Sequence, residues 1–530
     1  MKKLLKSRIK SFDAVAIIFS IAWILILTFD YFNKHAIYLD SVQHFKYFRL
    51  TIFYIVLGAL FVWIFDKDSK ILNKKRSHFF IPFTLLLFPI SILALAISYS
   101  KFYFQDISTG DYVYLLGQAL YVFLAGFIVL FACYCIGARV SQTFLNKKVI
   151  SKSHYTLDLG IGICIFILFL FGVAAFHLLN WIGALVLILL AIGLNYKFAW
   201  KGIVGIISFN PNYNKLQLAL LYLIGILFII NFIFILGPYP LGFDSRNYYL
   251  NIPKIIAAHN GLVEGFQPYN WELFISIGIV LFKKIEVSMF LAQIGAILAS
   301  ASAYQIARSI FRLDKTGAML ISLILIITPA ISRQMFIELK VDLALLFLQI
   351  ITIHLFVSYK IYKNKKENAM YIFSIILGIL LGIGLGIKLL HFFLIFALFA
   401  ALTLDKNKVY GLMFIILFGF GAILFLKLDD HTGLRGYHKH VNILSYILLA
   451  AGFLSGAWYL YTDFAKAKKS LVQMAIILTT CIVTISPWMA KTYYDTGSTN
   501  VIKLLRGSGS GHDIDQQKMS EIYNKIKSEE

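Results

Sequence analysis

The sequence predicts an all-α polytopic membrane protein with about 15 transmembrane helices, and three features of the chain support this fold class. The 530 residues are 60% hydrophobic and only 14% charged, whereas soluble domains contain about 25% charged residues. Apolar runs close to the ~20 residues that a helix needs to cross a bilayer recur along the chain. Lys and Arg, which give a formal net charge of +23, gather in the short segments between these runs. Membrane topology therefore accounts for much of the positive charge, and no nucleic-acid partner is expected.

The apolar runs place the spanning helices in two groups that a long polar loop, 237–285, separates. Before the loop, helices are predicted at about 13–29, 48–65, 79–98, 112–137, 157–179, 181–197 and 216–236. After the loop, they are predicted at about 286–308, 317–331, 342–360, 370–387, 389–404, 409–426, 441–461 and 471–488. The chain then ends in a polar tail.

The apolar segment 271–282 inside the polar loop is about twelve residues long, which is too short to cross a bilayer. If it does not span, the basic loops share one side of the membrane: 1–10, 66–78, 138–156, 197–215, 308–316, 359–369, 405–408 and 462–470. Positively charged loops favour the cytoplasmic side. The sequence therefore predicts an interfacial segment, a cytoplasmic N-terminus, and an outer face that holds loop 237–285 and the C-terminal tail.

Asp244 is the central acid of the polar loop and follows Gly242 and Phe243 just after a spanning helix. A carboxylate that is partly desolvated near the bilayer surface can have a raised pKa and act as a general base. A solvated loop acid, or a helix N-cap at the Asp-Ser pair, explains the same residue without a catalytic role.

Residues 245–259 predict a short amphipathic helix that lies on the membrane. One face would turn to lipid and the other, with Arg246, Lys254 and His259, to water. Such a helix can hold a substrate whose tail stays in lipid, or it can be an interfacial strut without a ligand. The residues expected on the lipid face are Tyr248, Leu250, Ile252, Ile255 and Ile256.

Three further acids lie at predicted helix ends on the outer face. Glu272 opens the short apolar segment, where it can cap a helix N-terminus or bind an acceptor or a metal. Glu338 and Asp342 are four residues apart, so they share a helical face and repel each other unless a cation or a proton lies between them. That cation is either a divalent metal or the charge of Arg333 and Lys340.

Two cationic residues are candidates for contact with an anionic group. Lys388 ends a run in which glycines recur at 378, 382, 384 and 386, and such small residues allow close helix packing. Lys388 can bind a phosphate, or it can be a snorkelling lysine that marks the helix end. Arg435 lies in the charged loop 429–440, which is either a mobile loop or a contributor to an anionic substrate site.

The chain resembles the GT-C superfamily of integral-membrane glycosyltransferases in five segments between residues 216 and 500. These are GFDSRNYYLNIPK, PYNWELFISIG, TPAISRQMFIELKVDLAL, GILLGIGLGIK and SPWMAKTYYDTGS. Their order is similar to that of bacterial members that use polyprenyl-phosphate sugars. The resemblance implies a catalytic module at 216–490 in a bacterial inner membrane. Residues 1–215 would form additional N-terminal helices, and 491–530 a polar outer tail.

The resemblance also implies an activity and roles for individual residues. A sugar would move with inversion from a polyprenyl-phosphate donor to a lipid, glycan or protein acceptor at the outer face. Asp244 matches the acid that acts as general base. Lys388, with Arg333 or Arg435, would stabilise the leaving phosphate. A divalent cation, Mg²⁺ or Mn²⁺, is optional in the family. The residues expected to bind substrate or acceptor are Arg246, Tyr248, Lys254, His259, Glu272 and Asp342.

Two alternatives belong to other functional classes. A transporter or flippase of lipid-linked or anionic solutes would favour internal repeats and charges near the bilayer midplane. The chain shows no clear repeat, and its charges are predicted at the outer interface. An O-antigen ligase or polymerase-like enzyme would rely on Arg and His in a large outer loop, for which 429–440 is short.

Overall fold

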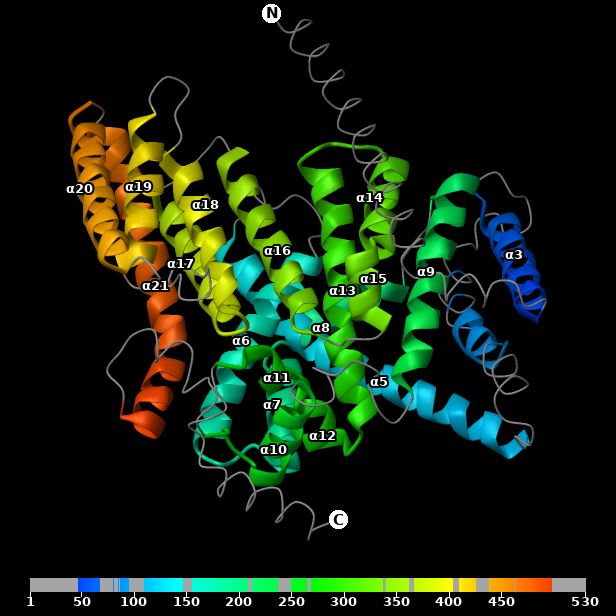
Figure 1. Cartoon of the computed structure of the whole chain (residues 1–530). Helices are drawn as coiled ribbons and strands as arrows, with labels where there is room; N and C mark the ends of the chain where they lie inside the picture. The colour runs from blue at the N-terminus through cyan, green and yellow to red at the C-terminus, as the bar shows by residue number, and fades with distance from the viewer. Residues whose placement is uncertain are drawn as a thin grey trace, which may run out of the picture. The chain divides into compact units, whose positions relative to one another are not determined.

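The fold is described by a computed structural model in which all regular secondary structure of the described residues is helical (Figure 1). Those residues are 46–66, 80, 84, 86–94, 109–145, 155–207, 212–236, 249–264, 268–336, 340–361, 367–403, 409–425, 438–462 and 464–497. The prediction of an all-α protein is confirmed for this part of the chain. The predicted helix 13–29 lies outside it.

The helices belong to two compact units, each built from several stretches of the chain. The first unit is residues Met1–Leu124, Gly202–Ser245 and Ala303–Lys340. It contains α3 (Lys46–Phe65), α9 (Lys215–Ile235), α14 (Lys315–Ile327) and α15 (Pro329–Phe336). In its core, Phe61 and Phe65 of α3 pack on Phe80, with Leu218 of α9 in the same cluster. The predicted module boundary at residue 215 stays a prediction.

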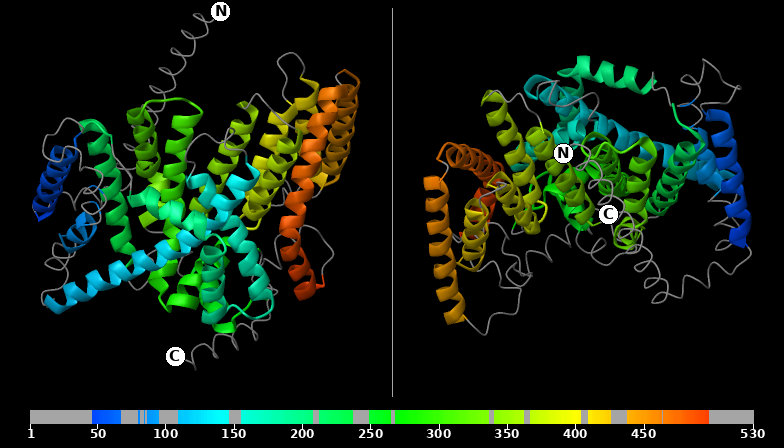
Figure 2. Two further views of the ribbon diagram at one scale, coloured as in Figure 1. Left: turned by 180° about the vertical axis from the view of Figure 1, so that it is seen from behind. Right: turned by 90° about the horizontal axis from the view of Figure 1, so that it is seen from above.

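The second unit is residues Ala125–Lys201, Arg246–Ser302 and Val341–Glu530. Its helices are α6 (Tyr155–Ala175), α7 (Trp181–Gly193), α10 (Asn251–His259), α11 (Asn270–Ile275), α12 (Ile277–Phe282), α16 (Asp342–Ile361), α17 (Glu367–Leu385), the 3-10 turn η3 (Leu389–His391), α18 (Phe392–Thr403), α19 (Tyr410–Phe425), α20 (His438–Thr462) and α21 (Phe464–Thr496). Three helices carry residues of both units: α5 (Thr109–Phe144), α8 (Tyr196–Ile207) and α13 (Ile285–Ser309). Within the second unit, α19 and α20 pack side by side, as the views in Figure 2 also show.

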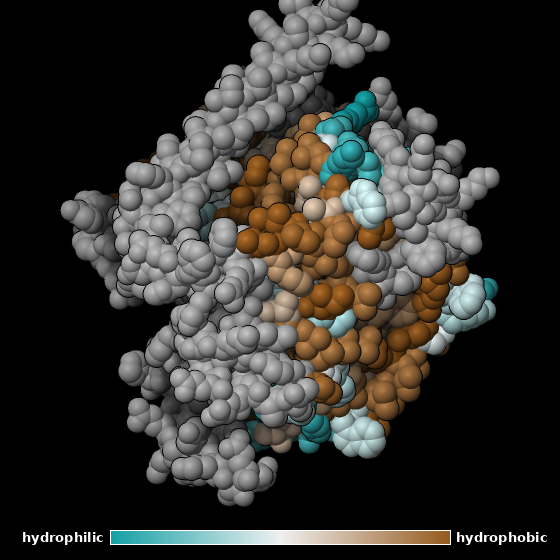
Figure 3. Space-filling model, turned by 90° about the vertical axis from the view of Figure 1, so that its right-hand side faces the viewer, coloured by the Kyte–Doolittle hydropathy of each residue, from teal (hydrophilic) through white to brown (hydrophobic). Residues whose placement is uncertain are grey.

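Among the described residues, seven helices are long and apolar enough to cross a membrane, or up to nine if each bent pair counts as one span. Large apolar side chains are exposed along many of these helices, and Figure 3 shows a continuous apolar surface over one described face. A lipid environment is the physical reason for such a surface, because soluble proteins rarely expose large apolar patches. The chain is thus a polytopic helical membrane protein, whereas fifteen spans are not confirmed.

Two of the predicted spans are broken rather than straight. Predicted helix 317–331 bends by 65° between α14 and α15. Pro329 causes this break because it disfavours helical backbone at Thr328, whose φ of −58° and ψ of 124° are not helical. Predicted helix 181–197 ends early, and the chain turns by 77° from α7 into α8.

Glycines let α17 and α21 pack closely, as the small-residue run predicted. A Cβ on Gly378 would lie 2.6 Å from Thr480 Cβ, and one on Gly382 would lie 2.6 Å from Thr484 Cβ. Both pairs advance by four residues in the same direction, so the two helices run parallel. The C-terminal ends of α17 and α21 therefore lie at the same end of the second unit.

The segment 270–282 forms two short helices of six residues each, α11 and α12. Even end to end, the two helices would extend about 20 Å, less than the ~30 Å hydrocarbon core of a bilayer. The prediction that 271–282 does not span is confirmed. The turn between them packs on α13, where Ser288 Oγ donates a hydrogen bond to the Ile275 carbonyl at 2.7 Å.

Helix α10 corrects the prediction of a lipid-facing amphipathic helix over 245–259. Its apolar residues, together with Leu250 before it, are buried in the protein. They pack against α11 and α12, which cover the face that was expected to meet lipid. The buried residues are Leu250, Ile252, Pro253, Ile255 and Ile256.

Candidate functional site

Polar residues from four helices of the second unit gather where α17 and α21 end and α16 begins. We call this group the α17-end site; its residues are Asn270, Glu272, Asp342, Lys388, His391, Trp488, Lys491 and Asp495. The sequence analysis had singled out Glu272, Asp342 and Lys388. The structure describes all three and brings two of them into direct contact.

Lys388 and Asp342 form an ion pair, with Lys388 Nζ 2.6 Å from Asp342 Oδ1. Asp342 is the first residue of α16, where the helix dipole favours a negative charge. Lys388 follows the end of α17 in an extended conformation, with φ −157° and ψ 131°. Their side chains are 36% and 27% exposed, so both can be reached from outside the protein. A lysine ammonium has three N–H donors, and those not used by Asp342 are available to an anion.

Asn270 fixes the position of the α17 end. Its backbone N–H donates to the Gly386 carbonyl at 3.0 Å, and its Nδ2 donates to the Ile383 carbonyl at 2.9 Å. Its Oδ1 accepts from Trp488 Nε1 of α21 at 2.6 Å. A Cβ on Gly386 would lie 2.2 Å from Asn270 Nδ2, so glycine lets the two segments approach. One buried amide thus ties α11, α17 and α21 together two residues before Lys388.

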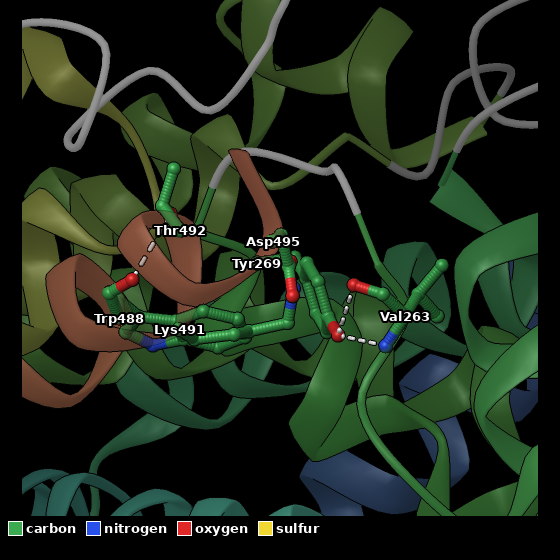
Figure 4. Close-up of polar contacts among 6 residues, drawn as sticks. All are labelled: Val263, Tyr269, Trp488, Lys491, Thr492 and Asp495. Atoms are coloured by element: carbon green, nitrogen blue, oxygen red, sulfur yellow. Dashed lines mark hydrogen bonds and ion pairs between the residues drawn. The ribbon is translucent and has the colours of Figure 1, made fainter. Parts of the chain in front are cut away.

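A second Lys–Asp pair lies on the last turns of α21 (Figure 4). Lys491 Nζ contacts Asp495 Oδ2, and both side chains are almost fully buried. Nearby, the Tyr269 ring stacks edge-on against Trp488 with 4.4 Å between centroids. The Tyr269 hydroxyl accepts from the Val263 backbone N–H at 2.5 Å. These contacts attach the segment between α10 and α11 to α21.

Glu272 is buried on α11, with 3% of its surface exposed. Its Oε2 atom has no hydrogen-bond partner among the described residues. Burial raises the pKa of this carboxyl to about 8, and a hydrogen bond to its own backbone opposes the shift only in part. At neutral pH the carboxyl is therefore largely protonated, and it can donate a hydrogen bond as well as accept one.

His391 is a residue of this site that the sequence analysis did not single out. It is fully buried one turn after Lys388, and its backbone N–H donates to the Lys388 carbonyl at 3.0 Å. Neither ring nitrogen has a partner among the residues that the structure describes. Its ring lies against Gly384, where a Cβ would be 2.3 Å from His391 Cδ2. The Lys-x-x-His spacing after the glycine run was the signal available in the sequence.

Asn270, Lys491 and Asp495 were also not assigned roles from the sequence. An asparagine beside an apolar segment, or an i,i+4 Lys–Asp pair, is common at solvated helix ends. The Asn270 amide bonds to α17 and α21, and the Lys491 and Asp495 side chains are almost fully buried; both features arise only from packing.

Three of the other predicted site residues are described by the structure. Arg333 is exposed on α15 and belongs to the first unit. Lys254 and His259 are half-buried on α10. Asp244, Arg246, Tyr248, Glu338 and Arg435 lie outside the described residues.

No group of three or more His, Cys, Asp or Glu side chains suited to a metal ion occurs among the described residues. At Asp342, the Lys388 ammonium occupies the place beside the carboxylate where a cation would bind. Glu338, the other acid predicted near a cation, is outside the described residues, so the optional divalent cation stays a prediction.

Comparison with protein-family models, with curated proteins and with solved structures finds no match for the chain.

Proposed function

We propose that the protein is a membrane glycosyltransferase that moves a sugar from a polyprenyl-phosphate donor to an acceptor at the outer face of a bacterial inner membrane. The observation that carries this proposal is the exposed Lys388–Asp342 pair at the end of a close-packed, glycine-rich helix. The Lys388 ammonium is held by one carboxylate and has further N–H groups that can donate hydrogen bonds. These suit the phosphate of a lipid-linked sugar whose lipid tail stays in the bilayer.

In the proposed reaction, an acceptor hydroxyl oxygen attacks the anomeric carbon of the sugar as its bond to the phosphate oxygen breaks. The bonding electron pair goes to the phosphate, and the Lys388 ammonium stabilises the negative charge that develops there. Asp244 takes the hydroxyl proton. Attack opposite the leaving phosphate inverts the anomeric carbon.

The remaining roles are part of the same proposal. Asp342 holds the Lys388 ammonium in position, and Arg333 or Arg435 adds positive charge toward the phosphate. Glu272 is buried in the structure, and its role in binding the acceptor is proposed on the resemblance alone. The other proposed substrate-binding residues are Arg246, Tyr248, Lys254 and His259.

The test is sugar transfer from a synthetic polyprenyl-phosphate sugar by the full chain in proteoliposomes. Lys388→Met is expected to lower the rate by a factor of about 10² or more, the usual effect of removing one charge-stabilising donor. Asp244→Asn is expected to abolish transfer without loss of membrane expression. Lys283→Gln, which removes an exposed charge from the end of α12, is the control. Full activity of Lys388→Met or Asp244→Asn would contradict the role assigned to that residue.

Lys388→Met alone leaves Asp342 without its counter-charge, so an inactive single variant could simply be unstable. The double variant Lys388→Met/Asp342→Asn removes both charges and keeps the volumes similar. It is expected to recover the thermal midpoint of the native chain but not its transfer rate. Recovery of both would show that the pair is only structural.

A transporter of lipid-linked or anionic solutes is the second candidate, and Gln293 favours it. This residue is fully buried in α13, a candidate span, and neither its Nε2 nor its Oε1 atom has a partner among the described residues. Polar groups inside a membrane are costly and often belong to substrate pathways. Movement of a labelled lipid-linked sugar between leaflets, without any transfer product, would select this alternative.

A further inference from the structure

Helix α8 leaves α7 at a corner that is held by polar contacts. The two helix axes differ by 77° across a break at residues 194 and 195. The buried Asn195 donates from Nδ2 to the Ala191 carbonyl at 2.6 Å, so its amide ends the hydrogen-bonding pattern of α7. Arg139 Nη1 of α5 donates to the Leu194 carbonyl at 3.2 Å and lies 3.4 Å from Asn195 Oδ1. The change of direction is thus built into the packing of α5 and α7.

One side of α8 carries an exposed apolar stripe. Tyr196, Trp200, Ile203 and Ile207 follow one another at helical spacing and so lie on one face. Trp200 is 68% exposed and Ile207 64% exposed. The side that faces the protein carries instead the small, buried Ala199. Among the described residues, none packs over this apolar stripe of Tyr196, Trp200, Ile203 and Ile207.

A separate side of α8 carries two lysines without acidic partners. Lys197 and Lys201 are both exposed and four residues apart. Their Nζ atoms lie 5.9 Å and 5.4 Å from the ring centroids of Tyr196 and Phe198, and neither lysine forms an ion pair with the described residues. The sequence contains no Asp or Glu between Asp158 and Asp244. This positive charge therefore has no neighbouring carboxylate along the chain.

We propose that α8 lies in the plane of the membrane surface and binds anionic phospholipids, with its aromatic stripe at the acyl boundary and Lys197 and Lys201 on the headgroups. Tryptophan and tyrosine rings favour this boundary, and lysines beside them attract anionic headgroups. The other end of α7 adjoins α10, because the Leu179 N–H donates to the Asn260 carbonyl at 3.0 Å. Helix α8 thus begins at the end of α7 that is away from α10. The proposal does not depend on the activity proposed above.

Depth measurements on the full chain in lipid nanodiscs test the orientation of α8. Nitroxide labels are placed one at a time at 196, 200, 203 and 207, with the four native cysteines, all buried, left in place. An interfacial helix puts every label at a similar depth, about 5–10 Å below the headgroups. A helix that continues the span of α7 changes depth by about 16 Å from 196 to 207, at 1.5 Å per residue. Such a gradient, or water exposure of all four labels, would overturn the proposal.

Lipid selectivity tests the role of the two lysines. The native chain, the double variant Lys197→Gln/Lys201→Gln and the control Lys283→Gln are purified from mixed phosphatidylcholine and phosphatidylglycerol vesicles. Bound phospholipids are then counted by native mass spectrometry. We expect the double variant to keep at most half as much phosphatidylglycerol as the native chain, and the control to match the native chain. Equal retention by all three proteins would overturn the headgroup contact.

Discussion

At the scale of single residues, Glu272 shows how burial can keep an acid uncharged in a membrane protein. Its carboxyl is buried on α11, two residues after Asn270, whose amide holds the end of α17. Burial disfavours the ionised form, because the apolar surroundings do not solvate a negative charge. The buried acid is thus a hydrogen-bond donor at neutral pH, unlike Asp342, which pairs with Lys388.

The raised pKa of Glu272 predicts a pH-dependent stability. In the unfolded chain the carboxyl titrates near its ordinary value of 4.5, and in the folded chain near 8. Between these values the folded state binds more protons at Glu272, so the contribution of this residue to stability is greatest below about pH 4.5 and falls as pH rises towards 8, by up to about 1.4 kcal/mol per pH unit. Glu272→Gln, which stays uncharged, is expected to weaken this decline. The decline is measured by thermal midpoints of the native chain and of Glu272→Gln in detergent between pH 5 and 9. Parallel curves for the two proteins would contradict the raised pKa of Glu272.

At the scale of elements, the close packing of α17 and α21 positions Lys388. Their glycine interface brings α17 against α21, and the Asn270 amide then ends α17 at Gly386. A short connection joins α16 to α17, so the two helices run in opposite directions. The end of α17 therefore lies near the start of α16. This antiparallel arrangement brings Asp342 to Lys388, 46 residues away in sequence.

A single added methyl group tests this interface. A Cβ on Gly382 would lie 2.6 Å from Thr484 Cβ and 2.8 Å from the Cys481 carbonyl oxygen. Backbone must move to make room, so Gly382→Ala is expected to cost about 1–3 kcal/mol and to lower the thermal midpoint. Gly172→Ala on α6 is the matched control, because its Cβ would meet nothing within 4 Å. Equal thermal midpoints for Gly382→Ala and Gly172→Ala would show that α17 and α21 can move apart without a loss of stability.

Sequence reasoning located most helices of the described chain because apolar length alone marks a membrane helix. It also identified 271–282 as too short to span. The ion-pair partner of Asp342 was not predicted, since Lys388 reaches it only through the pairing of α16 with α17. The apolar face of α10 was assigned to lipid, because hydrophobic periodicity does not distinguish lipid from a protein neighbour. The bend at Asn195 depends on a side-chain contact with Arg139, which spacing does not reveal.

At the scale of the whole molecule, the second unit has two ends that the sequence predicts on opposite sides of the membrane. Helix α21 joins them, with a candidate span of 29 residues. One end carries the α17-end site, α10 and α12. The other carries the start of α21, where Lys468 and Lys469 are exposed. The positive-inside bias of the basic loops in the sequence predicts that the end with Lys468 and Lys469 is cytoplasmic and that the α17-end site is at the outer face.

Cysteine labelling in intact cells tests this orientation. Lys283 and Lys469 are exposed at the two ends of the second unit, and the four native cysteines are buried, which limits background labelling. Lys283→Cys is expected to react with a membrane-impermeant maleimide in intact cells. Lys469→Cys should react only after permeabilisation, because α21 carries the chain across the bilayer between them. The reverse pattern would put the α17-end site in the cytoplasm. An outer-face sugar transfer would then be ruled out, although the Lys388–Asp342 pair itself would be unaffected.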